Sequence, residues 1–157
     1  MPGRNAGDIM ITLVTGATGL VGNNVVRHLL ASGRAVRVLA REEADPRPLA
    51  GLDVEVARGD IRDRQAVVRA VRGTGCVVHA AARVQIGWTD LATARAVNVE
   101  GTRNIAAAAH AEAVTLVHIS SLDALAARRG NGSVMNGSSR SAASSVPTCS
   151  PSARPSR

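Results

Sequence analysis

The chain has 157 residues, 45% of them hydrophobic, and a formal net charge of +7, so it can bury the core of one domain but is too short for two full ones. Five arginines and no acidic residue lie in residues 128–157, and this basic segment offers neither a folded motif nor stacking aromatics, so we expect no specific nucleic-acid binding. The chain contains no Tyr and no Lys, which excludes both side chains from any mechanism.

Short apolar runs alternate with helical patterns along the first 127 residues. We predict five strands, over residues 9–14, 35–40, 54–57, 76–80 and 114–119. Helices are predicted over 20–32, 63–71 and 91–111, with breaks at Gly33, Gly73 and Gly75 and an irregularity at Gly101. Strands that alternate with helices form βαβ units. We therefore expect an α/β fold with a doubly wound parallel sheet, covered by helices on both faces and truncated after the fifth strand.

The composition changes at about Arg128. Residues 128–157 contain nine Ser, five Arg, three Pro and three Gly, without hydrophobic periodicity. We assign residues 1–127 to a partial folded domain and residues 128–157 to a disordered tail rich in Ser and Arg. Met1–Asp8 lacks a signal-peptide core and no stretch is apolar enough to span a membrane, so we expect a cytoplasmic protein. No set of His, Cys and carboxylates has metal-ligand spacing, so we expect no metal.

The segment between the first strand and the first helix carries three evenly spaced glycines, Gly16, Gly19 and Gly22. Gly16 allows a tight turn, Gly19 lets backbone approach a phosphate, and Gly22 lets the helix pack against the sheet. The helix that starts at Leu20 directs its free amides at the pyrophosphate, and the Thr15 and Thr18 hydroxyls add donors. A strand before the loop and a helix after it are the context of a Rossmann-type dinucleotide site. The alternative is a glycine-rich turn without a ligand.

The second strand ends at Arg41, where NAD-binding proteins carry an acid that binds the ribose 2′-hydroxyl. A guanidinium there pairs instead with the 2′-phosphate of NADP, and Arg37 adds to it if its side chain faces the site. Glu42 and Glu43 favour NAD, since either carboxylate can reach the ribose. We favour NADP over NAD; the alternative for Arg41 is a solvated surface charge.

From about residue 9 to 126 the sequence resembles the extended short-chain dehydrogenase/reductase family, the NAD-dependent epimerase/dehydratase group, and within it dihydroflavonol-reductase-like and sugar-epimerase-like members. The motifs that carry the resemblance are Thr15–Gly22, Gly59–Ile61, His79–Ala82, Asn98–Asn104 and Val117–Ser121.

The resemblance implies a role for each motif. Asp60 and Ile61 would hold the adenine ring, and Ala80, Ala81 and Ala82 would leave room for ribose and pyrophosphate. Asn98 would belong to the cofactor site, and Ser121, with Ser120 as the substitute, would be the active-site serine. Simpler alternatives remain: Asp60 as a helix N-cap, the alanines as core filler, Asn98 as a buried polar group satisfied by backbone, His79 and His118 as strand histidines, and Trp88 as a substrate-facing residue or a core cap.

In this family the serine works with a Tyr and a Lys spaced YxxxK, about 25 residues further along, and neither residue type is present. We hypothesise a frameshift near residue 128. If the reading frame is moved back by one base, a Tyr codon is possible at the Pro147–Thr148 junction and a Lys codon at the Pro151–Ser152 junction. The DNA sequence tests this hypothesis. The resemblance implies an NAD(P)-dependent oxidoreductase, epimerase or dehydratase acting on a small sugar-nucleotide or similar carbonyl or hydroxyl substrate, catalytically impaired as given. The alternatives are a noncatalytic, redox-sensing dinucleotide-binding module and a nonfunctional truncated product.

Overall fold

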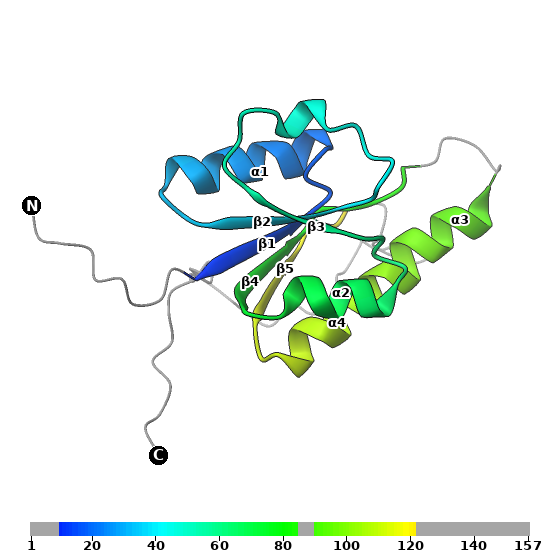
Figure 1. The fold of residues 1–157 in the computed structure, drawn as a ribbon. Coiled ribbons are helices and arrows are strands. Elements are labelled where there is room, and N and C mark those ends of the chain that lie inside the picture. Colours follow the sequence, from blue (N-terminus) through cyan, green and yellow to red (C-terminus); the bar gives the residue numbers. More distant parts are fainter. Residues whose placement is uncertain (1–9, 85–89, 122–157) are drawn as a thin grey trace, which may run out of the picture.

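The computed structural model describes residues 10–84 and 90–121 (Figure 1). Over these residues the elements are, in order, β1 (Ile11–Thr15), α1 (Leu20–Ala31), β2 (Val36–Ala40), the 3-10 turn η1 (Arg47–Leu49), β3 (Glu55–Arg58), α2 (Arg64–Val71), β4 (Thr74–His79), α3 (Leu91–Arg95), the π-helical segment η2 (Ala96–Gly101), α4 (Thr102–Ala111) and β5 (Thr115–His118). The sheet has the order β3-β2-β1-β4-β5, and all its pairings are parallel. The predicted Rossmann-type, doubly wound parallel sheet is confirmed.

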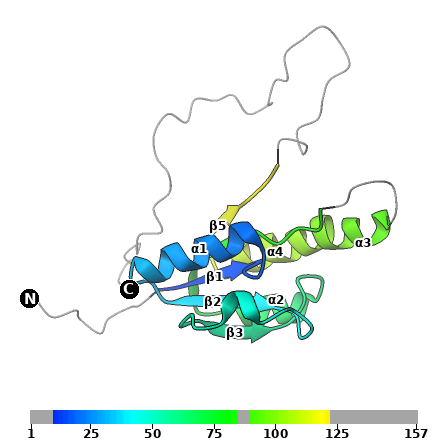
Figure 2. The same cartoon turned by 90° about the horizontal axis from the view of Figure 1, so that it is seen from above.

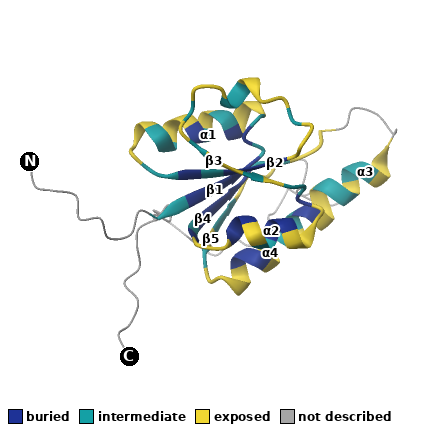
Figure 3. Ribbon diagram, in the orientation of Figure 1, coloured by how far each residue is buried: buried dark blue, intermediate teal, exposed yellow. Residues whose placement is uncertain are grey.

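Helices cover both faces of the sheet (Figure 1). One face packs under α1 with a core that includes Val14, Val26 and Val38, and the other packs against α2 and α4 with a core that includes Leu13 and Ile105. Consecutive strand residues point to opposite faces, so a strand covered on both sides is buried along its whole length, as β1 is from Thr12 to Thr15. Figure 3 shows this burial in the three central strands, with exposed residues on the outer helix surfaces.

The edge strands are less buried than the centre. Three of the four residues of β3 are exposed, and both ends of β5 are exposed. The description of a sheet covered on both sides therefore holds for β2, β1 and β4 but not for β3, a terminal strand of the sheet among the described residues, whose side chains are exposed on both faces.

Two local predictions differ from the structure. β4 begins at Thr74, directly after a turn at Gly73, so the predicted break at Gly75 is wrong and Gly75 lies inside the strand. Its missing side chain leaves room for Met10, whose Cε atom a methyl group at Gly75 would overlap. The side chain that caps α2 belongs to Asp63, which accepts hydrogen bonds from the amides of Gln65 and Ala66. The N-cap alternative for Asp60 is therefore wrong.

The predicted helix over 91–111 forms as α3, η2 and α4 in unbroken succession, and Figure 2 shows them as one rod beside the sheet. The irregularity expected at Gly101 is a π-helical segment, Ala96–Gly101, which ends at that glycine. Such segments are rare and occur often at functional sites. This one contains Asn98, which hydrogen-bonds Arg83 in the loop after β4, and it ends beside Thr102, which hydrogen-bonds His79 at the carboxyl end of β4.

Candidate functional site

A cavity of about 430 Å³ opens at the carboxyl edge of the sheet. Its wall is formed by the end of β2, by the loops that follow β1, β2, β3 and β4, and by one residue of η2: Gly16–Gly19, Leu39–Arg41, Ala44, Gly59–Ile61, Ala80–Val84 and Val97. The chain leaves β1 toward α1 on one face and leaves β4 toward α3 and α4 on the other (Figure 1). Adjacent parallel strands whose connections diverge in this way leave a crevice between them, which is where open α/β sheets bind ligands.

The glycine loop fits closely against the end of β4. Gly16 has a φ of +72°, and a Cβ atom there would lie 2.7 Å from the carbonyl carbon of Ala80. A Cβ at Gly22 would overlap the carbonyl oxygen of Gly16, so the helix start also needs a glycine. A Cβ at Gly19 would meet only the Gly16 oxygen, at an ordinary 3.4 Å. No protein atom therefore requires a glycine at position 19, and the space beside Gly19 in the cavity is open to a ligand.

The amino end of α1 points its backbone amides at this loop. Among the residues that the structure describes, no side chain caps this end and no acid lies in its first turn. Uncapped amides and the positive end of the helix dipole bind anions such as a pyrophosphate. Of the predicted cofactor residues here, Thr18 lines the cavity, whereas Leu20 is 82% exposed and, like Gly22, lies outside the wall.

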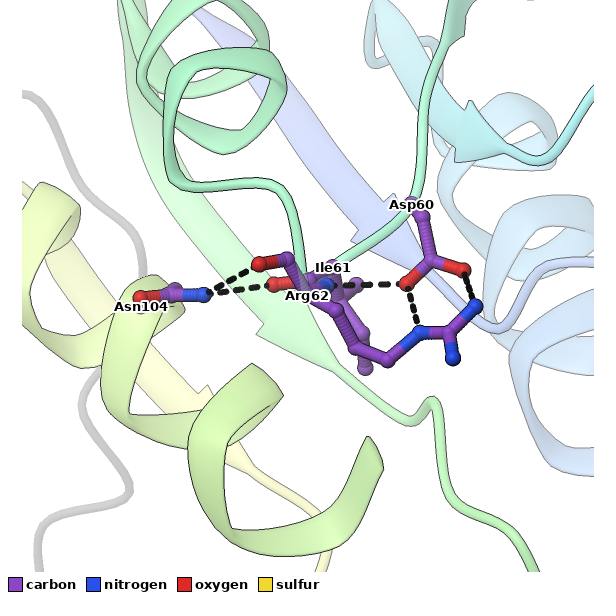
Figure 4. A network of polar contacts seen from close by, with 4 residues as sticks. All are labelled: Asp60, Ile61, Arg62 and Asn104. Carbon is purple, nitrogen blue, oxygen red and sulfur yellow. Dashed lines mark hydrogen bonds and ion pairs between the residues drawn. The ribbon is translucent and has the colours of Figure 1, made fainter. Parts of the chain in front are cut away.

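Asp60 and Ile61 both line the cavity, and an ordered loop holds them (Figure 4). The Asp60 carboxylate accepts hydrogen bonds from the backbone amide of Arg62 at 2.8 Å and from its guanidinium at 3.0 and 2.7 Å. The Arg62 guanidinium holds the pKa of Asp60 below its ordinary value. From α4, the amide of Asn104 donates to the carbonyls of Ile61 and Arg62 at 3.0 and 3.1 Å.

Sequence reasoning quoted Asn104 in a motif but assigned it no role, and it did not single out Arg62. The structure shows that both fix the loop that carries Asp60. Arg62 follows Asp60 by only two residues, so its local contact had a signal in the sequence, whereas Asn104 lies 43 residues from Ile61 and its contact had none.

The alanines after β4 and Asn98 have different places. Ala80, Ala81 and Ala82 line the cavity rather than fill the core. Asn98 lies outside the wall and holds the backbone of Arg83: its side-chain oxygen accepts from the Arg83 amide at 2.7 Å and its nitrogen donates to the Arg83 carbonyl at 2.9 Å. Asn98 is thus satisfied by backbone, although it is exposed rather than buried, and it shapes the loop from behind.

The arginines near β2 divide into two groups. Arg41 is exposed and lines the cavity, and the Arg58 guanidinium donates to the Arg41 carbonyl at 3.2 Å. Arg37 points elsewhere: it pairs with Glu55 at 2.9 Å and donates to the carbonyls of Ala70 and Arg72, both at 2.8 Å. The suggestion that Arg37 reaches the cofactor is therefore wrong.

The Thr15 hydroxyl was expected to face the pyrophosphate, but it is fully buried and lies 2.6 Å from Nδ1 of His79. The reason is the strand pleat, which turns the side chain of Thr15 toward α4. His79 is fully buried, and its ring stacks on that of His118 with centroids 5.2 Å apart.

Ser120 and Ser121 follow β5 at the carboxyl edge of the sheet. The Ile119 amide donates to the His79 carbonyl at 2.9 Å, so Ser120 and Ser121 follow directly beside the end of β4, and both are exposed. The predictions for Trp88 and for residues 128–157, including the frameshift, lie outside the described residues.

Residues 12–151 match the NAD dependent epimerase/dehydratase family. The chain belongs to this family. The match continues beyond residue 127, where the change in composition suggested that the domain ends. The resemblance found in the sequence motifs is thereby confirmed.

Relatives of this epimerase/dehydratase-family chain include reductases. It is 45% identical over 117 residues to sterol demethylase protein B of Methylococcus capsulatus, covering 74% of this chain and 36% of that protein. It is 40% identical over 96 residues to a putative dihydroflavonol 4-reductase of Synechocystis, covering 61% of this chain and 28% of the relative. The chain therefore spans about a third of the length of these relatives.

A solved structure of a short-chain dehydrogenase/reductase superfamily protein from Agrobacterium tumefaciens contains bound NAD. It matches this family member with 38% identity and a TM-score of 0.59, over 69% of this chain and 31% of that one. Within residues 10–84 and 90–121, no helix is long and apolar enough to cross a membrane, and no group of three or more His, Cys, Asp or Glu side chains is placed to hold a metal ion.

Proposed function

We propose that this chain binds NADP(H) in the cavity at the carboxyl edge of its sheet, with NAD(H) as the weaker ligand. The observation that carries the proposal is the cavity itself, whose wall includes the glycine loop that leads into the uncapped end of α1 and the paired carboxylate of Asp60. The amides of α1 would bind the pyrophosphate, Ala80–Ala82 would leave room for it, and Asp60 with Ile61 would contact the adenine.

The preference for NADP(H) rests on Arg41. Its exposed guanidinium follows β2 on the cavity wall, and the contact from Arg58 fixes its backbone. A charge-assisted hydrogen bond to the 2′-phosphate favours NADPH over NADH by about 1.5–3 kcal/mol. Glu42 and Glu43 oppose this preference, but their side chains are not part of the wall among the described residues.

The chemistry proposed for the whole protein is hydride transfer between the nicotinamide and a carbonyl or hydroxyl carbon of a small molecule, as in a reductase, epimerase or dehydratase. The nicotinamide supplies the hydride chemistry when it is bound. In this chain Ser121 would hydrogen-bond the substrate oxygen. Since these 157 residues contain no Tyr and no Lys, no phenol is present to deliver the proton, and we propose binding without turnover for this chain.

A binding titration tests the proposal. The nicotinamide fluorescence of NADPH and NADH gives the two Kd values for the chain and for its Arg41→Ala variant. We expect Arg41→Ala to weaken NADPH about tenfold or more while changing NADH little. Arg27→Ala, which removes an exposed arginine on α1 outside the cavity wall, is the control for net charge.

Two results would contradict the proposal. Failure of the unaltered chain to bind either cofactor rejects the site, and an equal effect of Arg41→Ala on both cofactors rejects the role of the 2′-phosphate. A turnover assay with NADPH and small ketones or aldehydes stands beside the titration. Turnover would reject binding without catalysis, whereas binding alone would favour a noncatalytic, redox-sensing role for these residues.

A further inference from the structure

A chain of hydrogen bonds runs behind the glycine loop, from β1 through β4 to α4, and it is buried at its Thr15–His79 link. Thr15 Oγ1 lies 2.6 Å from Nδ1 of His79, and Nε2 of the same ring lies 3.0 Å from Thr102 Oγ1. At one end the amide of Ala81 donates to Thr15 Oγ1 at 3.3 Å. At the other end the Thr102 hydroxyl donates to the carbonyl of Asn98 at 2.8 Å. The cofactor contacts proposed above use none of these side-chain groups.

The end groups determine the direction of every bond. The Asn98 carbonyl can only accept, so the single hydroxyl proton of Thr102 is used there and Thr102 Oγ1 must accept from His79. His79 therefore carries its proton on Nε2, and its Nδ1 accepts from the Thr15 hydroxyl. Thr15 Oγ1 is then free to accept from the Ala81 amide. The arrangement satisfies each group once and requires a neutral imidazole. Burial and the neighbouring His118 lower the pKa of His79 to about 4, which agrees with this state.

The chain connects the segments that wall the cavity. Thr15 directly precedes Gly16, His79 directly precedes Ala80, and Asn98 holds the Arg83 backbone. The fit between the first two segments is tight, because even a Cβ atom at Gly16 would come within 2.7 Å of the Ala80 backbone. A shift of a few tenths of an ångström between β1 and β4 would therefore change the shape of the cavity at its centre.

We propose that Thr15, His79 and Thr102 form a positioning network, in which the neutral Nε2–H tautomer of His79 holds the glycine loop and Ala80–Ala82 at the separation that the dinucleotide needs. The inference rests on the proposed function, since it concerns the affinity of that cofactor site. His79 itself touches no ligand in this arrangement. Its effect passes through the backbone that it fixes.

The test uses the full chain and the isosteric variant Thr102→Val, which removes the acceptor for His79 and the donor to Asn98. Thr74→Val is the control, because the Thr74 hydroxyl likewise donates to a helix carbonyl, that of Val71 at 2.7 Å, but lies at the amino end of β4, away from the cavity. We expect Thr102→Val to raise the Kd for NADPH about fivefold, the factor that one hydrogen bond represents. Thr102→Ser should restore the unaltered Kd. Thr74→Val should lower the urea midpoint of unfolding similarly but leave the Kd unchanged.

The tautomer is measured separately by ¹⁵N NMR of the His79 ring, where we expect a protonated Nε2 and an unprotonated Nδ1. A proton on Nδ1, or equal Kd changes in Thr102→Val and Thr74→Val, would overturn the inference. If Thr102→Val does not fold, Thr15→Val tests the same network from its other end with the same expectation. If the unaltered chain binds neither NADPH nor NADH, the proposed function fails and the positioning role fails with it, while the tautomer still reports on the hydrogen-bond chain.

Discussion

Gly16→Ala separates two reasons why a glycine is needed at the start of the cofactor loop. The first is conformational, because Gly16 has a φ of +72°, where a residue with a Cβ atom is strained. The second is steric, because the new methyl carbon would lie 2.7 Å from the carbonyl carbon and oxygen of Ala80 and from the amide nitrogen of Ala81. All three are backbone atoms of a wall segment, so they cannot rotate away as a flexible side chain would.

The chain contains a matched control for the conformational part. Gly51 has a φ of +73°, and a Cβ atom there would meet nothing within 4 Å. Gly51→Ala should therefore lower the free energy of unfolding by only the left-handed strain, about 1–2 kcal/mol. Gly16→Ala should show the same strain plus an overpacking cost of about 1–3 kcal/mol. The difference between the two variants isolates the collision with the end of β4.

Urea unfolding followed by circular dichroism measures both variants, and nicotinamide fluorescence measures their Kd for NADPH. We expect Gly16→Ala to unfold at lower urea than Gly51→Ala and to lose cofactor binding, while Gly51→Ala keeps it. Equal unfolding midpoints would refute the steric argument. Retained affinity in Gly16→Ala would refute the claim that the separation of β1 and β4 determines the shape of the cavity.

Three further results are expected. Gly101→Ala should lower the free energy of unfolding by about 1–3 kcal/mol, because its methyl carbon would lie 2.6 Å from Cδ1 of Ile61. In the double variant with Ile61→Ala, the loss of unfolding free energy should be smaller than the sum of the two single losses. Strict additivity in urea titrations would contradict the contact. The pKa of Asp60 should lie below 3.8 by carboxyl NMR titration, because the Arg62 guanidinium donates to this carboxylate, and Arg62→Gln should raise the pKa. The stabilisation of the fold by this pair is present above pH 3.8 and is lost as the pH falls through the lowered pKa. The His79 ring faces Thr15, Thr102 and the ring of His118, and its pKa is lowered from 6.5 to about 4. The free energy of unfolding should therefore fall by about 3 kcal/mol as the pH falls across that interval. A titration midpoint near 6.5 for this ring by NMR would contradict its burial as a neutral group.

The fold was readable from the sequence because its signals are local. Apolar runs such as Leu13–Val14 serve both faces of a sheet, and the glycine spacing marks the turn from strand to helix. The exposure of β3 was not readable, because its position at the edge depends on the order of strands rather than on its own residues. The prediction of a break at Gly75 was wrong for a related reason, since the space beside Gly75 is taken by Met10, which precedes β1 and is distant in the sequence.

Most of the predicted site residues line the cavity, because Gly16, Asp60 and Ala80 belong to motifs in a fixed order along the chain, whereas Leu20, Gly22 and Asn98 lie outside its wall. The direction of side chains was not. Thr15 turns into the core toward His79, and Arg37 turns to Glu55, because in a strand each side chain's face depends on register, which a single sequence does not give. Contacts between distant segments, such as that of Asn104 with the loop of Asp60, were likewise invisible before the fold was known.

The order of strands also has a consequence for how the chain folds. β1 is the first strand in the sequence, yet it lies at the centre of the sheet and pairs with β4 as well as with β2. The pairing of Thr15 with His79 joins residues 64 positions apart, so one edge of the first strand stays unpaired until the fourth strand has left the ribosome. Such non-local pairing slows folding, and an unpaired apolar strand is prone to join other chains. Synthesis of this domain therefore passes through a stage in which a strand that is buried at the centre of the folded sheet still has an unpaired edge.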